Sequence, residues 1–435
     1  MNIIPENLAK KYNAFPLNIN GNLLSVGIEN ENIYAIQDLK LATGMDIMLK
    51  KEDKETIEHN LKRIYNRSFK IDENYARNIF ESMLEEAIIL NASDIHIEPS
   101  DNYLIIRMRL DGDLKEVSRF TMDVYPYLSS VIKLDMSMNI TEKRLPQDGR
   151  ADFTIKKQSI DIRASSIPTV YGEKIVLRIL NRDSFLKDKS ELGFSNEAIT
   201  KIKNILHKKS GILLVTGSTG SGKTTTVYSL LNDLKNISKN IMTIEDPVEY
   251  KLDGINQIQV NSKIGLTFDI GLRSILRQDP DIIMIGEIRD IETAKIAIRA
   301  ATTGHLVIST MHTRDSISAI SRLIDMNIEP YLINASLIGI ISQKLVRKLC
   351  SSCNGEENLE CIRCSGNKYY GRTAIYEILE ISEKIKECIQ NKKSSMYIRE
   401  VALKSNNIIT FEDTIKNLIK DNITTLEECT LVNNI

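Results

Sequence analysis

Apolar residues recur along the chain with different spacings, and each spacing predicts a different kind of structure. Between Asn74 and Leu90 they recur at helical spacing, whereas Ile95 and Ile97 alternate with polar neighbours as in a half-buried strand. From Ile212 onward, near-continuous apolar runs alternate with helical segments. Such runs are typical of a parallel sheet covered by helices on both faces. The pattern therefore predicts an α/β chain in which a parallel-sheet domain follows a smaller α+β domain.

The first 68 residues form a separate segment, which we predict to be a small α/β module (1–68). Short apolar runs occupy residues 23–28 and 33–36, and a helical pattern covers residues 55–65. None of these residues forms a pattern with recognisable chemistry. We therefore expect this module to dock a partner.

The predicted α+β domain covers residues 69–183. After the strand at 95–98, the pattern predicts an alternating strand at 104–110. Asp111-Gly112 then supplies the hairpin turn that ends it. The other elements that the pattern predicts here are strands at 151–155, 159–165 and 174–180 and a helix over 124–138.

A hydrophilic stretch, residues 184–190, reads as a linker to the third part of the chain, residues 191–435. Strands are predicted there at 212–216, 241–245, 281–286 and 306–310, with helices between them. Residues beyond about 375 read as mostly helical, giving a C-terminal helical region (375–435).

Composition narrows the class of protein. Lys and Arg number 57 against 58 Asp and Glu, so the net charge of −1 argues against a dedicated nucleic-acid surface. No apolar stretch approaches the roughly 18 residues that span a bilayer, and the first residues lack the pattern of a secretory signal. We expect a cytoplasmic protein that reaches a membrane only through partners.

A glycine-rich loop of the form G-x-x-x-x-G-K-T follows the apolar run 212–215. Such a loop wraps backbone N–H groups around the phosphates of a nucleotide, its lysine reaches the β- and γ-phosphates, and its threonine can hold Mg²⁺. The following helix, without Gly or Pro, points its positive dipole end at the same phosphates. We therefore predict ATP and Mg²⁺ binding by Gly217, Ser218, Thr219, Gly220, Ser221, Gly222, Lys223, Thr224 and Thr225.

Two strands end in carboxylates that could act on the nucleotide. Glu287 closes the apolar run 281–286, at the edge where ligands of open α/β sheets bind. Glu245 begins a second acidic cluster that includes Glu249, and such a cluster calls for a compensating cation such as Mg²⁺, held directly or through water. Glu287 is our preferred candidate to orient or deprotonate water. The sequence does not decide between it and Glu245.

A histidine stands at each end of the last apolar strand, residues 306–310. His312, at the presumed ligand end, is a candidate sensor of the γ-phosphate, whereas His305 reads equally well as a structural residue. Arginines could stabilise the charge of a phosphoryl transition state, although an exposed arginine is more often part of a weak surface ion pair. The candidates are Arg150 and Arg163 in the α+β domain, and Arg273 and Arg277, four residues apart on a predicted helix.

Four cysteines form two C-x-x-C pairs, Cys350 with Cys353 and Cys361 with Cys364. Paired C-x-x-C units supply the four thiolates of a tetrahedral structural zinc site. The link between the pairs is short but can extend roughly 25 Å, so chain length permits closure. We predict a zinc subdomain over 348–366 and expect Cys388 and Cys429 to be ordinary buried thiols.

Several long motifs in this order resemble the secretion ATPase superfamily of type II secretion and type IV pilus assembly. The motifs are residues 92–99, the P-loop, an acidic box at 244–250, the strand segment 278–290, a histidine box at 304–313, and Gly371-Arg372.

The resemblance implies a RecA-like ATPase domain preceded by a PAS-like domain, with ATP between them and six copies in a ring. It also implies that arginines at positions 150, 163, 273 and 277 serve the phosphates. The cysteine subdomain and the extra N-terminal module resemble the assembly and export branches rather than the retraction motors.

The function this implies is ATP-driven assembly of pilins or pseudopilins. The motor would act through an inner-membrane platform protein and cytoplasmic assembly proteins, at the inner face of the cytoplasmic membrane. It would contact pilin subunits only indirectly and nucleic acid not at all. Two alternatives stay open: a nucleic-acid translocating ATPase of conjugation or DNA uptake, and a nucleotide-gated scaffold whose turnover is not required.

Overall fold

The computed structural model describes residues 3–29, 33–54, 56–57, 60–61, 72–155, 158–181, 188–356, 361, 363–364 and 366–433. Most of the helix predicted over 55–65, most of the linker 184–190 and part of the link between the cysteine pairs lie outside these residues. The chain divides into two compact units, Met1–Met83 with Phe120–Ile132, and Leu84–Arg119 with Lys133–Ile435. Within the described residues, no helix has both the length and the apolar character needed to cross a bilayer.

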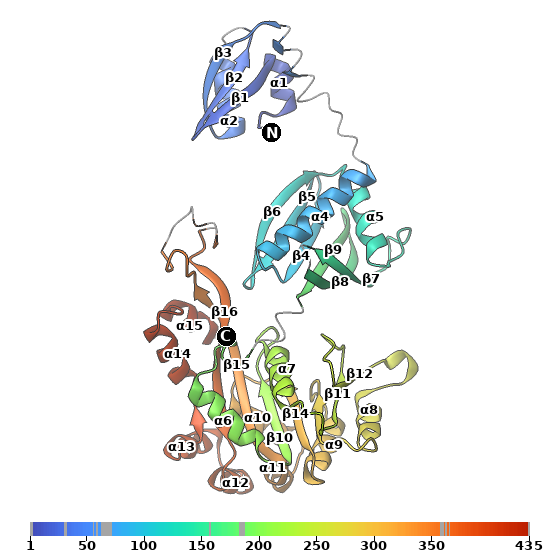
Figure 1. Ribbon diagram of the computed structural model, residues 1–435, viewed down its shortest axis with the longest axis vertical. Helices are drawn as coiled ribbons and strands as arrows, with labels where there is room; N and C mark the ends of the chain where they lie inside the picture. Colours follow the sequence, from blue (N-terminus) through green and yellow to red (C-terminus); the bar gives the residue numbers. More distant parts are fainter. Residues whose placement is uncertain are drawn as a thin grey trace. The chain divides into compact units, whose positions relative to one another are not determined.

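Among its described residues, the N-terminal module contains a three-stranded sheet and the helices α1 and α2 (Figure 1). Strand β2 lies in the middle, antiparallel to β1 and parallel to β3. Leu24, Val26 and Ala35 are among the side chains that close its core. The elements are α1 (Glu6–Tyr12), β1 (Ala14–Asn20), β2 (Leu23–Ile28), α2 (Ile33–Thr43) and β3 (Asp46–Lys51).

The second part of the chain forms a six-stranded sheet in the order β6-β5-β4-β9-β8-β7. The hairpin turn predicted at Asp111-Gly112 joins β5 to β6, and both residues have positive φ. Its strands are β4 (Asp94–Pro99), β5 (Tyr103–Leu110), β6 (Asp113–Thr121), β7 (Gln147–Ile155), β8 (Gln158–Thr169) and β9 (Gly172–Asn181). The same stretch holds helices α4 (Glu73–Ile89) and α5 (Tyr125–Asp135). The elements agree with the α+β pattern that the sequence predicts.

The third part contains an eight-stranded sheet in the order β12-β11-β13-β14-β10-β15-β16-β17. The first six strands are parallel, and β10, which leads into the P-loop, lies among them. Its strands are β10 (Gly211–Thr216), β11 (Ile241–Glu245), β12 (Asn256–Gln259), β13 (Ile282–Ile285), β14 (Leu306–Met311), β15 (Leu337–Leu349), β16 (Tyr369–Glu380) and β17 (Ile408–Ile409). The parallel sheet that the sequence predicts is therefore present.

Helices cover both faces of this sheet, and successive strand residues point to opposite faces. Leu213 and Val215 of β10 join one apolar cluster, whereas Ile212 and Leu214 join the other. The first cluster contains side chains of α6 (Asn196–Leu206) and α7 (Lys223–Leu234). The second contains side chains of α8 (Phe268–Ile275), α9 (Ile291–Thr302), α10 (Ser316–Asp325), α11 (Pro330–Ser336), α12 (Glu383–Gln390) and α13 (Ser395–Lys404). Burial on both faces explains the consecutive apolar residues of the central strands, such as Ile212–Val215 of β10 and Ile282–Ile285 of β13.

The C-terminal part differs from the prediction at one edge of the sheet. Strand β16 runs on to Glu380 and pairs antiparallel with β15, and β17 extends the antiparallel edge. The mostly helical region therefore begins at Glu383 rather than near residue 375. Helices α14 (Phe411–Lys420) and α15 (Leu426–Asn433) complete it. The long hairpin between β15 and β16 carries the four cysteines.

Candidate nucleotide and metal sites

The glycine-rich loop joins the end of β10 to the start of α7. Gly217, Gly220 and Gly222 have φ values of +149°, +79° and +85°, which residues other than glycine rarely adopt. A Cβ atom on Gly217 would also lie 2.4 Å from the backbone oxygen of Gln343. Of the other predicted loop residues, Ser218 and Thr219 are exposed. The loop thus has the backbone that a phosphate cradle requires.

Lys223 lies buried at the first position of α7. Its Nζ donates hydrogen bonds of 2.9 Å to the carbonyls of Gly217 and Ser218. Burial lowers the pKa of Lys223 to about 8, and the negative charge of Glu287 partly opposes this shift. The ammonium is therefore held inside the loop, close enough to Glu287 to feel its charge. Thr224 and Thr225 follow it and are half-buried.

Gln343 supports the loop from β15, and no motif in the sequence includes it. This buried side chain accepts a 2.7 Å hydrogen bond from the Thr226 hydroxyl, and its Nε2 donates at 2.7 Å to the Ser221 carbonyl. The sequence does not single it out, because its neighbours Ser342 and Lys344 in β15 are polar as well. A buried carboxamide with both ends paired fixes the distance between β15 and the loop.

Glu287 follows β13 and lies beside two basic side chains. Its Oε2 is 2.6 Å from Arg289 Nε and 3.8 Å from His312 Nε2. Burial first, and then the Lys223 charge, lowers the pKa of His312, which favours the neutral imidazole. Lys223, Glu287 and His312 therefore gather at the carboxyl ends of neighbouring strands, where ligands of open α/β sheets bind. Arg289 also belongs to this group, although it was not among the arginines predicted to act on the phosphates.

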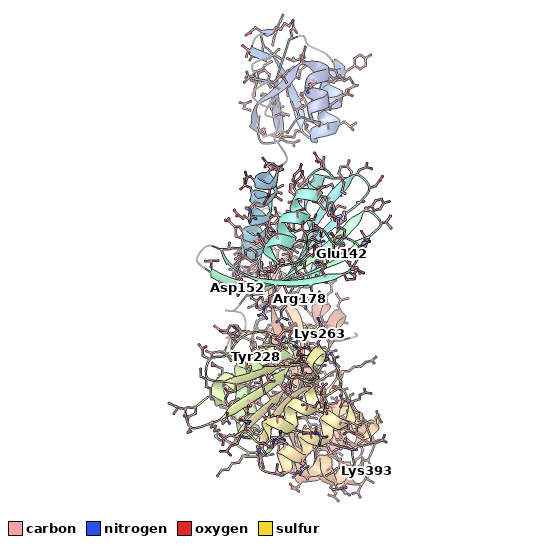
Figure 2. All side chains as sticks on the ribbon, turned by 90° about the vertical axis from the view of Figure 1, so that its right-hand side faces the viewer. Glu142, Asp152, Arg178, Tyr228, Lys263 and Lys393 are labelled. Carbon is pink, nitrogen blue, oxygen red and sulfur yellow. The ribbon has the colours of Figure 1, made fainter. Side chains whose placement is uncertain are left out.

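Glu245 has quite different surroundings from Glu287. It is buried at the end of β11, where it accepts hydrogen bonds from the Tyr228 hydroxyl, from Thr243 Oγ1 at 2.6 Å and from Gln257 Nε2 at 3.1 Å. Burial and the charge of Glu245 raise the pKa of Tyr228, so the phenol stays protonated as a donor. Figure 2 labels Tyr228 among the packed side chains of this part of the chain. The carboxylate oxygens of Glu245 thus already accept hydrogen bonds from three donors. Tyr228, one of these donors, was not predicted from the sequence.

The other acidic-box carboxylate, Glu249, contacts an arginine of the six-stranded part. Arg163 lies 2.8 Å from Glu249 Oε2 and donates to the Val248 carbonyl at 2.8 Å. Arg150 is the register partner of Arg163 across β7 and β8, and it donates to Asp161 Oδ1 at 2.9 Å. The structure therefore brings Arg163 to the acidic box and pairs Arg150 with a carboxylate of its own sheet.

The remaining two arginines do not share a helix as predicted. Helix α8 ends at Ile275, so it contains Arg273 but not Arg277. Arg277 instead donates a 2.9 Å hydrogen bond back to the Arg273 carbonyl. Asp279 has a left-handed φ of +50° just before Pro280, a conformation that cannot continue a helix. The helical spacing of this pair was therefore a wrong prediction.

His305 lies at the opposite edge of the sheet, before β14. Its Nδ1 is 2.9 Å from the Ala300 carbonyl and 3.2 Å from the Thr303 hydroxyl. These contacts join the end of α9 to the start of β14 and give His305 a structural role. They agree with the interpretation of His305 as a structural residue.

A cleft of about 1040 Å³ opens beside the P-loop helix. Gly222, Thr225 and Thr226 line one part of it, and Ser93 and Ile179 line another. Charged side chains, among them Lys348, Arg363 and Arg372, also line this cleft, whereas Lys223, Glu287 and His312 do not, so the cleft lies beside the P-loop helix and not around those three side chains.

The four cysteines of the β15–β16 hairpin come together as the C-x-x-C spacing predicts. Their sulfur atoms all lie within 4.8 Å of one another, with Sγ–Sγ distances of 3.8 Å for Cys350 and Cys361 and 3.6 Å for Cys353 and Cys364. A tetrahedron of thiolates with Zn–S bonds of about 2.3 Å has an edge of about 3.8 Å. The four are free thiols, so the cluster could hold a zinc ion.

Relatives of this chain fall into one family. The model of the family described as "Type II/IV secretion system protein" matches residues 70–431. The type IV pilus assembly ATPase PilB of Thermus thermophilus is 39% identical over 477 residues, which cover 98% of this chain and 54% of the relative. The type II secretion system protein HxcR of Pseudomonas aeruginosa is 43% identical over 355 residues, covering 80% of this chain and 76% of the relative. Type II secretion system protein E of Dickeya dadantii is 45% identical over 340 residues, covering 74% and 68%.

Solved structures agree on the fold. The pilus retraction motor PilT with bound ADP aligns with a TM-score of 0.60 and 28% identity, covering 81% of this chain and 96% of PilT. The ATPase DotB of Legionella pneumophila aligns with a TM-score of 0.65 at 23% identity, covering 81% and 94%. The RecA-like fold predicted by resemblance is therefore confirmed. Because the family model covers most of the sequence, this chain belongs to the type II/IV secretion system protein family, whose relatives include the pilus assembly and secretion ATPases.

Proposed function

We propose that this secretion ATPase binds ATP with Mg²⁺ at the loop 217–224 and uses Glu287 to orient or deprotonate the attacking water. The observation that carries the proposal is the convergence of three groups. Glu287 lies 3.8 Å from His312, and its charge acts on the Lys223 ammonium, at the edge where the P-loop opens. The lysine would hold the β- and γ-phosphates, and the carboxylate would stand where the nucleophile approaches. His312, kept neutral, would sense the γ-phosphate.

Glu245 receives a different role from Glu287 in this proposal. Its oxygens already accept bonds from Tyr228, Thr243 and Gln257, so it is poorly placed to take a proton from water. It would instead fix the acidic box, and with Glu249 it would contribute to the Mg²⁺ site through water. The Thr224 hydroxyl is the direct protein ligand that we propose. Bound Mg²⁺ would offset the negative charge of the phosphates.

Arg150, Arg163, Arg273 and Arg277 are proposed to serve the phosphates when the ring closes. Arg163 supports this most directly, because it already contacts the acidic box through Glu249 and Val248. A guanidinium near the γ-phosphate stabilises the charge that develops during transfer. The pairing of Arg150 with Asp161 would have to open for Arg150 to take part.

Cys350, Cys353, Cys361 and Cys364 are proposed to hold a structural zinc ion. The sulfur–sulfur distances of 3.6 and 3.8 Å support this, because they fit the edges of a thiolate tetrahedron. All four positions would be filled by protein, so the ion would stabilise the β15–β16 hairpin and take no part in hydrolysis.

For the whole machine, we propose a ring of six copies that powers assembly of pilins or pseudopilins. The support is the naming of the relatives, one an assembly ATPase of type IV pili and others proteins of type II secretion. The motor would lie in the cytoplasm at the inner face of the membrane, and it would act through a membrane platform protein and cytoplasmic assembly proteins. Residues 1–68 would dock one of these partners. Nucleic acid would not be a direct partner.

The test is an ATPase assay on the purified chain, with its mass in solution measured by light scattering. We expect phosphate release by the parental chain and none above background by Lys223→Ala. A control, Lys263→Ala in the exposed 3-10 helix Ser262–Ile264, should keep the parental rate. A Lys223→Ala variant with the parental rate would refute the site. Rates are measured with and without single- and double-stranded DNA, because stimulation by DNA would favour a translocase instead. In cells, pili assembled by a Glu287→Gln variant would favour the scaffold alternative.

A further inference from the structure

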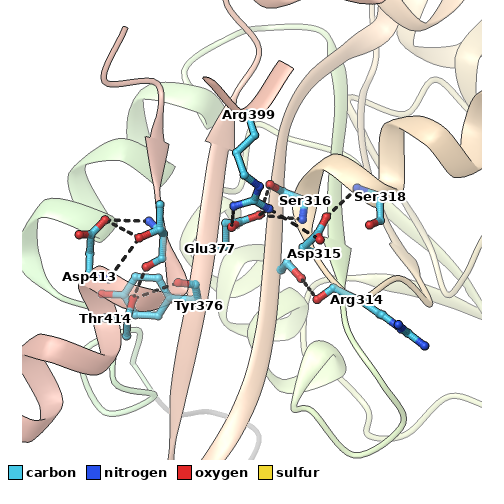
Figure 3. Close-up of polar contacts among 11 residues, drawn as sticks. Arg314, Asp315, Ser316, Ser318, Tyr376, Glu377, Arg399, Asp413 and Thr414 are labelled. Carbon is cyan, nitrogen blue, oxygen red and sulfur yellow. Dashed lines mark hydrogen bonds and ion pairs between the residues drawn. The ribbon is translucent and has the colours of Figure 1, made fainter. Parts of the chain in front are cut away.

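The loop that carries His312 is anchored at its far end by polar contacts around the buried carboxylate of Glu377 (Figure 3). This loop joins β14 to α10. Asp315 caps α10 by accepting the Ser318 N–H at 2.7 Å, and the Ser316 N–H donates to Glu377 Oε1 at 3.0 Å. The Ser316 hydroxyl donates to the same carboxylate oxygen. The end of the loop therefore depends on one side chain of β16, Glu377.

Glu377 is a buried carboxylate that needs a cation. Its side chain is 1% exposed, and its charge is paired by Arg399 of α13. Arg399 donates to the two carboxylate oxygens at 2.8 and 3.3 Å, and it lies 3.7 Å from Asp315 Oδ2. A planar guanidinium can bind Glu377 through two nitrogens and still reach Asp315, a geometry that the single ammonium nitrogen of a lysine does not reproduce. Removing one partner of such a pair leaves the other charge buried and unpaired.

The strand pair β15–β16 links this network to the P-loop. Ser342 is the register partner of Glu377, and its hydroxyl donates to the Arg314 carbonyl at 3.4 Å. The next residue, Gln343, points to the opposite face and donates to the Ser221 carbonyl of the P-loop. Two adjacent residues of one strand thus hold the two loops that the proposed chemistry uses.

From these contacts we infer that Glu377 and Arg399 are positioning residues for hydrolysis, which hold His312 against Glu287. The inference rests on the proposed roles of His312 and Glu287. The P-loop contacts do not pass through Arg399, so its loss should displace the His312 loop while leaving the phosphate cradle in place. A small displacement of a reacting group lowers the turnover rate more than it lowers binding.

The experiment compares Arg399→Lys and Glu377→Gln with two matched controls, Arg322→Lys on the exposed side of α10 and Glu380→Gln at the end of β16. We expect the first pair to lower kcat by up to roughly 10²-fold, with an unchanged Kd for a fluorescent ATP analogue. The controls should keep the parental kcat. Hydrogen exchange of residues 312–318 should quicken in Arg399→Lys. Unchanged exchange together with the parental kcat would overturn the inference.

A double variant separates positioning from general stability. If Arg399 acts through the His312 loop, His312→Ala combined with Arg399→Lys should have the kcat of His312→Ala alone. Effects that multiply would show two independent contributions and would overturn the inference. A parental kcat in His312→Ala alone would also overturn it, since no histidine would then need positioning. In that case an inactive Lys223→Ala would still support the ATPase assignment, so the two failures are distinguishable.

Discussion

Tyr228 of α7 donates its phenolic hydrogen bond to Glu245 at the end of β11, and both side chains are buried. The helix that carries the P-loop is thereby tied to the acidic box. The Glu249 N–H also donates to the Tyr228 oxygen, at 3.3 Å, so one phenol contacts two residues of the box. This contact suggests that Glu245 is a structural carboxylate, in contrast to the more accessible Glu287.

The first prediction is that Tyr228→Phe destabilises the fold by about 1–3 kcal/mol, because the buried Glu245 carboxylate loses a donor. Urea unfolding measures the change. The matched control is Tyr331→Phe, at a side chain that is 60% exposed, which should change stability by less than about 0.5 kcal/mol. Equal stability of Tyr228→Phe and the parent would show that the contact contributes nothing.

The second prediction concerns the two carboxylates. Glu287→Gln should lower kcat by roughly 10²–10⁴-fold, the usual contribution of a general base, while the analogue still binds. Glu245→Gln should mainly reduce stability, because its amide cannot accept all the bonds that the carboxylate accepts. Glu292→Gln, on the exposed side of α9, is the control. The reverse order of the two kcat losses would assign the base to Glu245.

The third prediction follows from the lowered pKa of Lys223, about 8 in the protein without nucleotide. Below that pH the ammonium is charged and attracts the triphosphate, and above it the neutral amine does not. Affinity for an ATP analogue should therefore fall as pH rises through 8, by about tenfold at one pH unit above the pKa. Calorimetric titration between pH 7 and 9 would measure the fall, together with proton uptake on binding. A constant Kd across this range would contradict the prediction.

The fourth prediction concerns the cysteine cluster. The purified chain should contain one zinc ion per molecule, and Cys353→Ser or Cys361→Ser should lose it and melt at a lower temperature. Cys388→Ser is a matched control, because this buried thiol of α12 lies outside the cluster and should leave the zinc content unchanged. Elemental analysis gives the content directly. A parental chain without zinc after metal-replete expression would refute the site.

Local patterns predicted much of this structure. The bounds of β11, Ile241–Glu245, agree with the prediction, and β14 begins at the predicted residue, Leu306, because apolar runs are signals confined to a few residues. The facing cysteines followed from a spacing that has one common physical use. These features need no knowledge of distant neighbours.

The features that were not predicted depend on contacts between residues that are far apart in the sequence. Gln343 contacts Ser221 across 122 residues, and Tyr228 meets Glu245 from another element, so neither partner can be read from its neighbours. The last residues of β16 were predicted to belong to a helical region. Their strand structure depends on pairing with β15, which the residues of β16 alone do not indicate. The shared helix of Arg273 and Arg277 failed for a local reason, since helical spacing alone did not weigh the turn before Pro280.

The alternation along β15 constrains how the length of this protein can vary. A single residue inserted or deleted between Leu337 and Ser342 would exchange the faces of Ser342 and Gln343, removing both loop supports at once. Residues added beyond Leu349, where β15 ends and the cysteine hairpin begins, would not change the faces to which Ser342 and Gln343 point. Insertions and deletions should therefore accumulate past the end of β15, and the first half of the strand should keep its number of residues.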